Sequence, residues 1–271
     1  MSSYSLIYEP RGRAREYAPL ACNVYRGCDH QCSYCYAASA TQRSRSDFNI
    51  PATRGADFIT RLTREAFKRQ SRGQAGRVLL CFTCDPYQHL DAELGLTRQV
   101  IQVLHNTGHA VEVLTKGGSR ALRDIDLLGP GDAFASTLTL LDAESSLEWE
   151  PGAATPANRI ETIRAFHSAG VPTWVSLEPV LDPGIALEII RQTHTFVDLF
   201  KVGRLNYHPL AQQIDWPKFG CDAIALLKSV GSQYYIKRDL ACLLPSHLVT
   251  DTRTAEPEPV QRPAVRQMSL L

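Results

Sequence analysis

Residues 78–115 read VLLCFTCDPYQHLDAELGLTRQVIQVLHNTGHAVEVLT, and this stretch predicts one complete β/α/β unit. The apolar run at 78–83 ends at Asp85-Pro86, which is typical of a buried strand. Residues 96–106 have the apolar spacing of a helix, Gly108 is a stop signal, and 110–115 predict the next strand. Two such strands joined by a helix lie parallel in one sheet, so the stretch indicates an α/β protein.

The same alternation continues along the chain. A helix is expected at 57–72, ahead of the first strand. Later strands at 133–140, 171–177, 197–202 and 233–237 alternate with helices at 158–169, 185–192 and 221–230. About six β/α units, two short of a closed barrel, predict a partial (β/α)6 TIM-type barrel. The chemistry of such barrels gathers at the carboxyl ends of the strands.

Composition narrows the class of protein. The chain is 44% hydrophobic and 21% charged, which is ordinary for a globular protein. Its formal net charge of +1 argues against a wholly basic surface but allows a local basic patch. No apolar run reaches membrane-spanning length, and residues 1–17 lack the apolar core of a signal peptide. We therefore expect a cytoplasmic protein with no membrane partner.

Three of the eight cysteines, Cys28, Cys32 and Cys35, form a C-x3-C-x2-C array. In a reducing compartment, clustered cysteines bind metal or do chemistry more often than they form disulfides. Three thiolates can hold three corners of a four-iron cluster and leave the fourth iron open. The alternative is a zinc knuckle closed by His30 or by a distant cysteine, although zinc ribbons usually pair two C-x2-C halves.

The residues around these cysteines carry a family resemblance. Residues 23–37 read NVYRGCDHQCSYCYA, with Tyr34 directly before the last cysteine. This run resembles the radical S-adenosylmethionine (SAM) superfamily and, within it, the spore photoproduct lyase-like branch, also labelled DNA repair photolyase-like. Later segments that resemble the same branch are 83–88 with 96–98, 115–116 with 123–124, Ser136 with Asp142, and 150–152 with Arg159. The resemblance spans roughly residues 20 to 205.

The resemblance implies two cofactors, a [4Fe-4S] cluster and SAM. The implied cluster ligands are Cys28, Cys32 and Cys35, and SAM closes the open iron. An external electron donor reduces the cluster, SAM is cleaved, and a 5′-deoxyadenosyl radical then removes a hydrogen atom from the substrate. The cofactors supply the radical chemistry, and the protein holds SAM and the substrate in line.

The resemblance also implies which residues bind SAM. Tyr34 lies by the adenine, where a flat ring can stack. Cys84 and Asp85 contact the methionyl amino group, Lys116 pairs with the carboxylate, and Ser136 forms a hydrogen bond beside it. The alternative for Lys116 is a solvated loop lysine.

Glu178 and Arg204 follow the strands at 171–177 and 197–202. This strand-end position favours contacts with SAM or with the substrate. The alternative for both residues is an ordinary turn and a solvated charge.

Cys81 and Cys84 are the candidates for a catalytic hydrogen-atom donor. Spore photoproduct lyases use a cysteine near this point to return a hydrogen atom to the product radical, and alignment on Thr83 and Asp85 puts Phe82 at its position. Strand alternation predicts Cys81 on the face opposite Phe82 and Cys84 on the same face as Phe82. The alternatives are two structural cysteines or an auxiliary metal site on the C-x2-C pair.

The C-terminal residues predict a tether with a docking peptide. Residues 250–266 hold three prolines and almost no large apolar side chains, which is typical of a disordered segment. The last five residues resemble peptides by which bacterial replication and repair proteins dock on the DNA sliding clamp, with a chance match as the alternative. These residues are Gln267, Met268, Ser269, Leu270 and Leu271. The expected divisions are an N-terminal extension (1–18), a radical SAM core (19–205), a C-terminal α/β extension (206–249) and the tether (250–271).

Together these features predict a radical SAM enzyme that removes a hydrogen atom from a nucleic-acid substrate in DNA repair or modification. One alternative is the same chemistry on RNA, a peptide or a small metabolite. Another is a non-catalytic, metal-stabilised module recruited to the clamp. The basic segment 61–77 is expected to be a solvated helix face, with phosphate contacts as its alternative.

Overall fold

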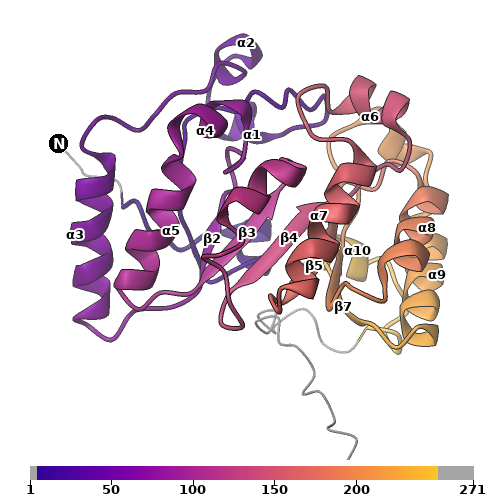
Figure 1. Cartoon of the computed structure of the whole chain (residues 1–271). Helices are drawn as coiled ribbons and strands as arrows, with labels where there is room; N and C mark the ends of the chain where they lie inside the picture. The colour runs from indigo at the N-terminus through magenta and orange to yellow at the C-terminus, as the bar shows by residue number, and fades with distance from the viewer. Residues whose placement is uncertain (1–4, 250–271) are drawn as a thin grey trace, which may run out of the picture.

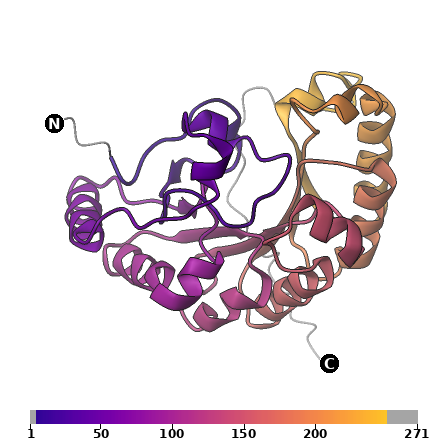
Figure 2. The same cartoon turned by 90° about the horizontal axis from the view of Figure 1, so that it is seen from above.

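The computed structural model describes residues 5–249 of the chain. Within them, seven parallel strands form one sheet in the order of the sequence (Figure 1). The strands are β1 (Leu20–Ala21), β2 (Val78–Leu80), β3 (Val111–Thr115), β4 (Ala133–Thr137), β5 (Thr173–Leu177), β6 (Leu199–Val202) and β7 (Gln233–Ile236). The sheet curves, with helices on its outer side and an opening between its first and last strands (Figure 2). The expected partial barrel is confirmed.

The sheet has one strand more than the six expected. Strand β1 is two residues long and immediately precedes the cysteine loop, so it is too short to show alternation in the sequence. It pairs with β2 through Leu20 and Ala21. At the other edge β7 pairs with β6, so residues 233–236 of the C-terminal extension continue the same sheet.

Helices connect the strands on the outer side. The α-helices are α1 (Ala37–Ala40), α2 (Arg45–Phe48), α3 (Phe58–Gln70), α4 (His89–Leu94), α5 (Leu96–Asn106), α6 (Ala143–Trp149), α7 (Pro156–Ser168), α8 (Pro183–Thr193), α9 (Trp216–Ser229) and α10 (Arg238–Ala241). Three 3-10 helices are η1 (Gly12–Glu16), η2 (Gly118–Asp124) and η3 (Pro209–Gln212). The longer helices begin where the sequence caps them: Thr155 accepts a hydrogen bond from the Asn158 amide at α7, and Asp215 accepts one from Lys218 at α9.

Alternating side chains of the strands separate two cores. On the outer face of β4, Phe134 stacks on Phe166 of α7 with ring centroids 3.8 Å apart, within the main core that the helices cover. On the inner face, Ala133 and Ala135 belong to a smaller apolar cluster together with Trp174 of β5. Small alanine side chains leave room inside the barrel for the chain that crosses its open side.

The crossing chain is an N-terminal strap, residues 5–19. It begins beside α3, where Glu65 accepts hydrogen bonds from the amides of Leu6 and Ile7 (Figures 1 and 2). It ends near β7, where Glu16 accepts hydrogen bonds from the Tyr235 hydroxyl and the Arg238 amide. The strap therefore links the two edges of the open barrel.

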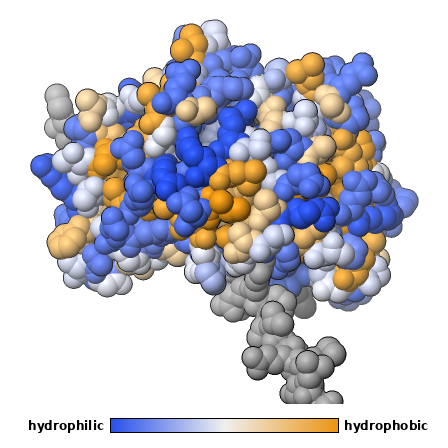
Figure 3. All heavy atoms as spheres, viewed as in Figure 1, coloured by the Kyte–Doolittle hydropathy of each residue, from blue (hydrophilic) through white to orange (hydrophobic). Residues whose placement is uncertain are grey.

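Hydrophilic residues predominate on the helix-covered face, and apolar residues form separate patches there (Figure 3). None of the helices among residues 5–249 has the length and apolar character needed to span a bilayer.

Candidate active site

The three clustered cysteines lie on the loop between β1 and α1, at the carboxyl end of the sheet. Two glycines allow this loop to pack closely. Gly27 has φ +82°, and a Cβ there would lie 2.5 Å from the Phe48 carbonyl oxygen. A Cβ on Gly152 would lie 2.2 Å from the carbonyl oxygen of Asp29, and the Gly152 amide donates to the His30 carbonyl at 2.9 Å. Both positions therefore require glycine.

Polar groups of the protein fix the backbone and the sulfurs of this loop. Arg45 of α2 donates to the Cys35 carbonyl at 2.8 Å and also to the Cys32 carbonyl. The Ala37 amide donates to the Cys35 sulfur at 3.4 Å. Such N–H···S bonds are among the features that tune the sulfur ligands of iron–sulfur clusters.

The donor set fits an iron–sulfur cluster. Burial raises the pKa of the Cys28 thiol well above its usual value, and burial raises that of Cys32 to about 11 despite the opposing effect of Lys116. Deprotonation of these thiols therefore needs the charge of bound iron. Three thiolates are soft ligands that suit iron–sulfur binding, and the Cys35 sulfur also accepts an amide hydrogen bond. Across residues 5–249, no group of three or more histidine, cysteine and acidic side chains is arranged to hold a single metal ion.

His30 belongs to a buried polar network. Its Nδ1 lies 3.4 Å from the Asp85 Oδ2 atom, and its Nε2 lies 3.0 Å from an Arg120 guanidinium nitrogen. Burial lowers the pKa of the ring to about 4. Both ring nitrogens thus already have protein partners, which argues against the zinc-knuckle alternative with His30 as a ligand.

Asp85 joins the ends of β2 and β3. Its Oδ1 atom accepts hydrogen bonds from the Tyr87 amide and the Thr115 hydroxyl at 2.8 and 2.6 Å, and its Oδ2 atom accepts one from the Lys116 amide at 2.7 Å. Burial opposes ionisation, but His30 and these donors hold the pKa of Asp85 below its usual value. With His30 as a fourth neighbour, all its lone-pair positions are engaged. Asp85 positions Lys116, and its direct contact with SAM stays a prediction.

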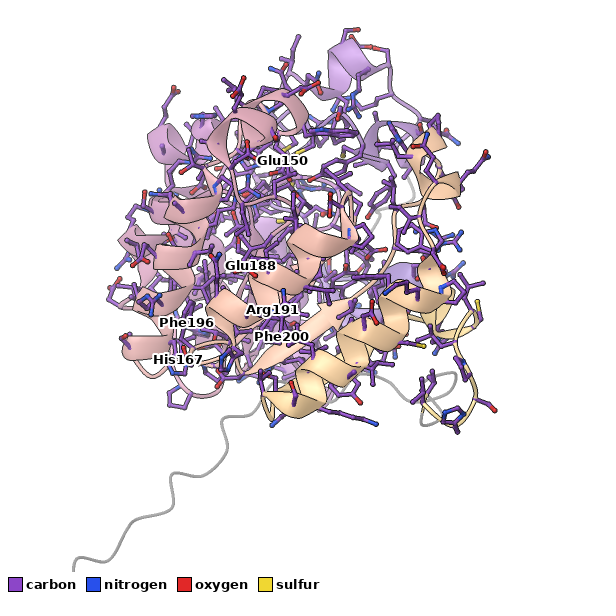
Figure 4. All side chains as sticks on the ribbon, turned by 90° about the vertical axis from the view of Figure 1, so that its right-hand side faces the viewer. Glu150, His167, Glu188, Arg191, Phe196 and Phe200 are labelled. Atoms are coloured by element: carbon purple, nitrogen blue, oxygen red, sulfur yellow. The ribbon has the colours of Figure 1, made fainter. Side chains whose placement is uncertain are left out.

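Tyr34 is held by a second buried network at the same end of the sheet. Its hydroxyl donates to Glu150, which also accepts hydrogen bonds from Thr139 at 3.1 Å and from Arg159. Glu150 and Arg159 are each 1% exposed, so their ion pair is fully buried. Glu150 lies in the upper part of the molecule, and Phe200 and His167 lie below it (Figure 4). The network fixes the Tyr34 ring beside the cysteine loop.

Lys116 follows β3 directly and is partly buried. Its ammonium nitrogen lies 5.9 Å from the centroid of the Tyr34 ring. Burial opposes its charge, but Cys32 and Glu150 raise its pKa, so the side chain is a cation. A cation beside both Tyr34 and the cysteine loop suits a carboxylate ligand. Its burial differs from that of a solvated loop lysine, and its contact with SAM stays a prediction.

Ser136 of β4 is 1% exposed, and its hydroxyl donates to the Thr115 carbonyl at 2.7 Å. In this structure it therefore supports the strand end that carries Lys116. Its predicted hydrogen bond to SAM stays a prediction.

Cys84 does not share the face of Phe82, and that expectation is wrong. Phe82 packs with the inner apolar cluster, whereas Cys84 packs with Cys81 against the main core. The reason is that β2 ends at Leu80, so strand alternation does not continue through residues 82–84. Burial raises the pKa of the Cys81 thiol well above its usual value, and the neighbouring Cys84 thiol raises it further. Their sulfurs accept amide hydrogen bonds from Val24 and Tyr25, respectively, at the start of the cysteine loop.

Glu178 belongs to a polar cluster on the inner face. Its Oε2 atom accepts hydrogen bonds from the Tyr17 hydroxyl at 2.6 Å and from the Lys237 ammonium. The Tyr17 hydroxyl also lies 3.1 Å from the Ser176 hydroxyl oxygen. Arg204 has other partners, with its Nε atom 3.2 Å from Asn206 and its guanidinium 6.0 Å from the centroid of the Trp216 ring. The described contacts do not bring Arg204 to the other candidate residues.

Several site residues escaped sequence reasoning. Tyr17 and Arg45 lie in segments without periodicity or a motif, so the sequence gives no signal for them. Lys237 directly follows β7 and could have been found by the strand-end argument that selected Glu178. Arg120 lies in a short 3-10 helix and carries no comparable signal.

A family model described as the radical SAM superfamily matches residues 22–197. An uncharacterised protein of Mycobacterium tuberculosis is 31% identical over 173 residues, which cover 59% of this chain and 48% of that protein. The chain thus spans about half the length of this relative. An uncharacterised protein of Methanocaldococcus jannaschii is 23% identical over 192 residues, covering 70% of this chain and 71% of that protein.

Solved structures share the fold at low identity. A spore photoproduct lyase variant has a TM-score of 0.67 and 12% identity, covering 88% of this chain and 80% of that one. A spore photoproduct lyase complex with a dinucleoside spore photoproduct has a TM-score of 0.63 and 13% identity, covering 82% and 76%. Streptococcus suis SuiB bound to its precursor peptide SuiA has a TM-score of 0.59 and 13% identity, covering 80% and 48%.

Proposed function

We propose that this protein, which belongs to the radical SAM superfamily, acts on a nucleic acid. As a radical SAM enzyme it uses a [4Fe-4S] cluster and SAM as cofactors. The proposed reaction removes a hydrogen atom from the substrate in DNA repair or modification. The family also needs an external electron donor. The observation that carries the nucleic-acid assignment is the likeness, over most of both chains, to spore photoproduct lyase bound to a dinucleoside.

The protein's own residues have distinct proposed roles. Cys28, Cys32 and Cys35 hold the cluster, which together with SAM supplies hydrogen-atom abstraction. Lys116 binds the carboxylate of SAM, and Tyr34 packs against its adenine. Because Glu150 holds the Tyr34 hydroxyl and Asp85 holds the Lys116 backbone amide before SAM arrives, binding costs little reorganisation.

The inner-face polar cluster of Glu178, Tyr17 and Lys237 is the proposed substrate-facing wall. Its Tyr17–Glu178 hydrogen bond and its buried lysine give both donors and acceptors. Cys84, half-buried beside the cysteine loop, is the proposed hydrogen-atom donor, and Cys81 is the buried thiol next to it.

Anaerobic reconstitution tests the cofactor assignment. It should give about four irons per chain and a broad visible absorption that a Cys32→Ala variant loses. Zinc binding alone, with no cluster, would contradict it. SAM and a reductant should then yield 5′-deoxyadenosine, which a non-catalytic module would not form.

Parallel incubations with different candidate substrates test the substrate class. Damaged DNA, intact DNA, RNA and a mixed peptide pool are each incubated with the reconstituted enzyme, SAM and reductant. Modification of DNA, with 5′-deoxyadenosine above the background level, supports the proposal. SuiB binds a peptide, so a peptide substrate is the competing outcome, and modification of the peptide pool alone would refute a nucleic-acid substrate.

Recruitment to the DNA sliding clamp stays a prediction from the sequence, because residues 267–271 lie outside the described residues. A synthetic peptide of residues 261–271 should bind a purified bacterial clamp, and a Gln267→Ala peptide should bind more weakly. Equal binding of both peptides would argue for a chance match. The cytoplasmic location is proposed on the sequence alone.

A further inference from the structure

The molecular surface has a cationic groove beneath the N-terminal strap. It consists of two adjoining hollows of about 640 and 270 Å³ that share Ser5 and Arg69 in their walls. The strap forms one wall, and the carboxyl-terminal half of α3 forms another. The cations that line this arginine groove are Arg11, Arg15, Lys68, Arg69, Arg72 and Arg238.

Few acidic groups compensate this charge. The groove contains two carboxylates, Glu9 and Glu65. Glu65 already accepts hydrogen bonds from the strap amides, and Glu9 lies 3.8 Å from Arg15. The other five cations form no ion pair among residues 5–249. Since the whole chain carries only +1, this is a local concentration of positive charge.

Arg69 is the most informative member of the groove. It lines both hollows, and its Nε atom is buried without a hydrogen-bond partner among the described residues. A buried, unpaired N–H group of a charged side chain is costly, so a ligand that accepts from it gains that energy. The planar guanidinium matches the oxygens of a phosphate in a bidentate manner.

The helix dipole does not explain the groove. Lys68 and Arg69 lie in the last turn of α3, where cations interact favourably with the helix end. Arg11, however, lies on the strap, and Arg238 begins α10 on the opposite edge of the barrel. Three separate segments therefore contribute cations to one hollow.

The groove also adjoins the site described above. Tyr8 lines the groove, and its hydroxyl accepts a hydrogen bond of 2.9 Å from the side-chain Nδ2 atom of Asn23. Asn23 in turn accepts hydrogen bonds from the amides of Phe82 and Thr83 at the end of β2. On the other side, Arg238 directly follows Lys237, the partner of Glu178. A polyanion lying in the groove would thus extend beside the active site.

We propose that the arginine groove binds the phosphodiester backbone of the nucleic-acid substrate and holds it alongside the active site. This inference rests on the proposed function and adds the surface that binds the substrate. Phosphate contacts set affinity and position without reading sequence, so binding through the groove is independent of base sequence and depends on salt.

The test compares the full chain with an Arg11→Ala/Lys68→Ala/Arg72→Ala variant. Fluorescence anisotropy with labelled single-stranded and duplex DNA is measured between about 50 and 200 mM salt, the range over which phosphate contacts are most visible. Each lost contact to a single strand removes about 0.7 from the slope of log K against log salt, so the slope should fall by about 2. The same three contacts predict affinity about 100-fold weaker at about 100 mM salt.

Arg64→Ala is the matched control, because Arg64 is an exposed arginine of α3 outside the groove. It should leave affinity and slope unchanged, and circular dichroism with a melting curve checks that each variant is folded. Equal effects of the control and the triple variant would overturn the proposal, as would an unchanged slope in the triple variant. Preferential binding of anionic vesicles or of polyglutamate over DNA would overturn it as well.

Turnover separates this proposal from the proposed function. If DNA is modified but the triple variant keeps the KM for DNA, the groove is refuted while the function stands. If DNA binds through the groove but is not modified, the function fails while the groove stands.

Discussion

Replacing Arg159 by methionine should be the most informative perturbation of the site. The guanidinium donates to Glu150, to the Thr137 carbonyl at 3.1 Å and to the Ala154 carbonyl at 2.7 Å. Methionine fills similar volume but supplies none of these hydrogen bonds. Glu150, 1% exposed, would then remain as a buried carboxylate without its counter-ion. Breaking a buried pair in this way costs about 3–5 kcal/mol, a large part of the roughly 5–15 kcal/mol that keeps a domain folded.

Equilibrium urea unfolding of the apoprotein measures this loss. Lys218→Met is the control, because Lys218 and Asp222 form an exposed i,i+4 pair that should contribute only about 0.3–0.5 kcal/mol. A Glu150→Gln/Arg159→Met double variant should recover part of the stability, since neither charge of the pair remains buried. A loss below about 1 kcal/mol in Arg159→Met, close to the exposed control, would refute the described burial.

The same pair predicts a dependence on pH. Burial opposes ionisation of Glu150, but Arg159, Lys116 and Tyr34 hold its pKa below its usual value of 4.5. Its contribution to stability is therefore complete above 4.5 and is lost as the pH falls through the lowered folded-state pKa. Arg159→Met should remove this acid-side loss, and an unchanged pH profile in the variant would contradict the assignment.

Three further predictions concern the cofactor site and the inner-face polar cluster. Gly152→Ala should prevent cluster retention on reconstitution, because its Cβ would lie 2.2 Å from the Asp29 carbonyl oxygen. Iron content measures retention, and the control Gly131→Ala, whose Cβ would lie in open space, should retain the cluster. Lys116→Met should raise the KM for SAM by about 10-fold or more, because a charge-assisted hydrogen bond of about 1.5–3 kcal/mol is lost. Unaltered SAM affinity would show that Lys116 does not bind SAM. Lys237→Met should leave Glu178 without its cation and lower turnover more than SAM binding; an equal change in SAM affinity would place this cluster at the cofactor instead.

The alternating units could be predicted because each buried strand and each amphipathic helix carries its own periodicity. This held for β2, α5 and β3, whose positions follow from residues 78–115. Strand β1 and the strap were missed because a two-residue strand and an irregular segment have no period. The orientation of Cys84 was wrong because alternation was carried past Leu80, where the strand ends.

Site residues that are neighbours in the sequence could likewise be predicted, whereas those that only the fold brings together could not. The cysteine array could be identified because its ligands are neighbours in the sequence. Lys116 could be placed at a strand end from the sequence, but its anionic neighbours could not, because Glu150 and Asp85 come from other loops. The Tyr17–Glu178–Lys237 cluster joins three distant segments, and only the folded, curved sheet brings them together.

The strap also constrains when the protein can be completed during biosynthesis. Glu16 binds Tyr235 and Arg238, which follow it by 219 and 222 positions, and Glu178 obtains its cation from Lys237. At about 5–20 residues per second, the roughly 200 residues between the cysteine loop and Lys237 take about 10–40 s to synthesise. During that interval the thiols have left the ribosome but the last strand does not yet exist. Completion of the Tyr17–Glu178–Lys237 cluster is therefore a late step, and a nascent chain with all three cysteines still lacks one member of it.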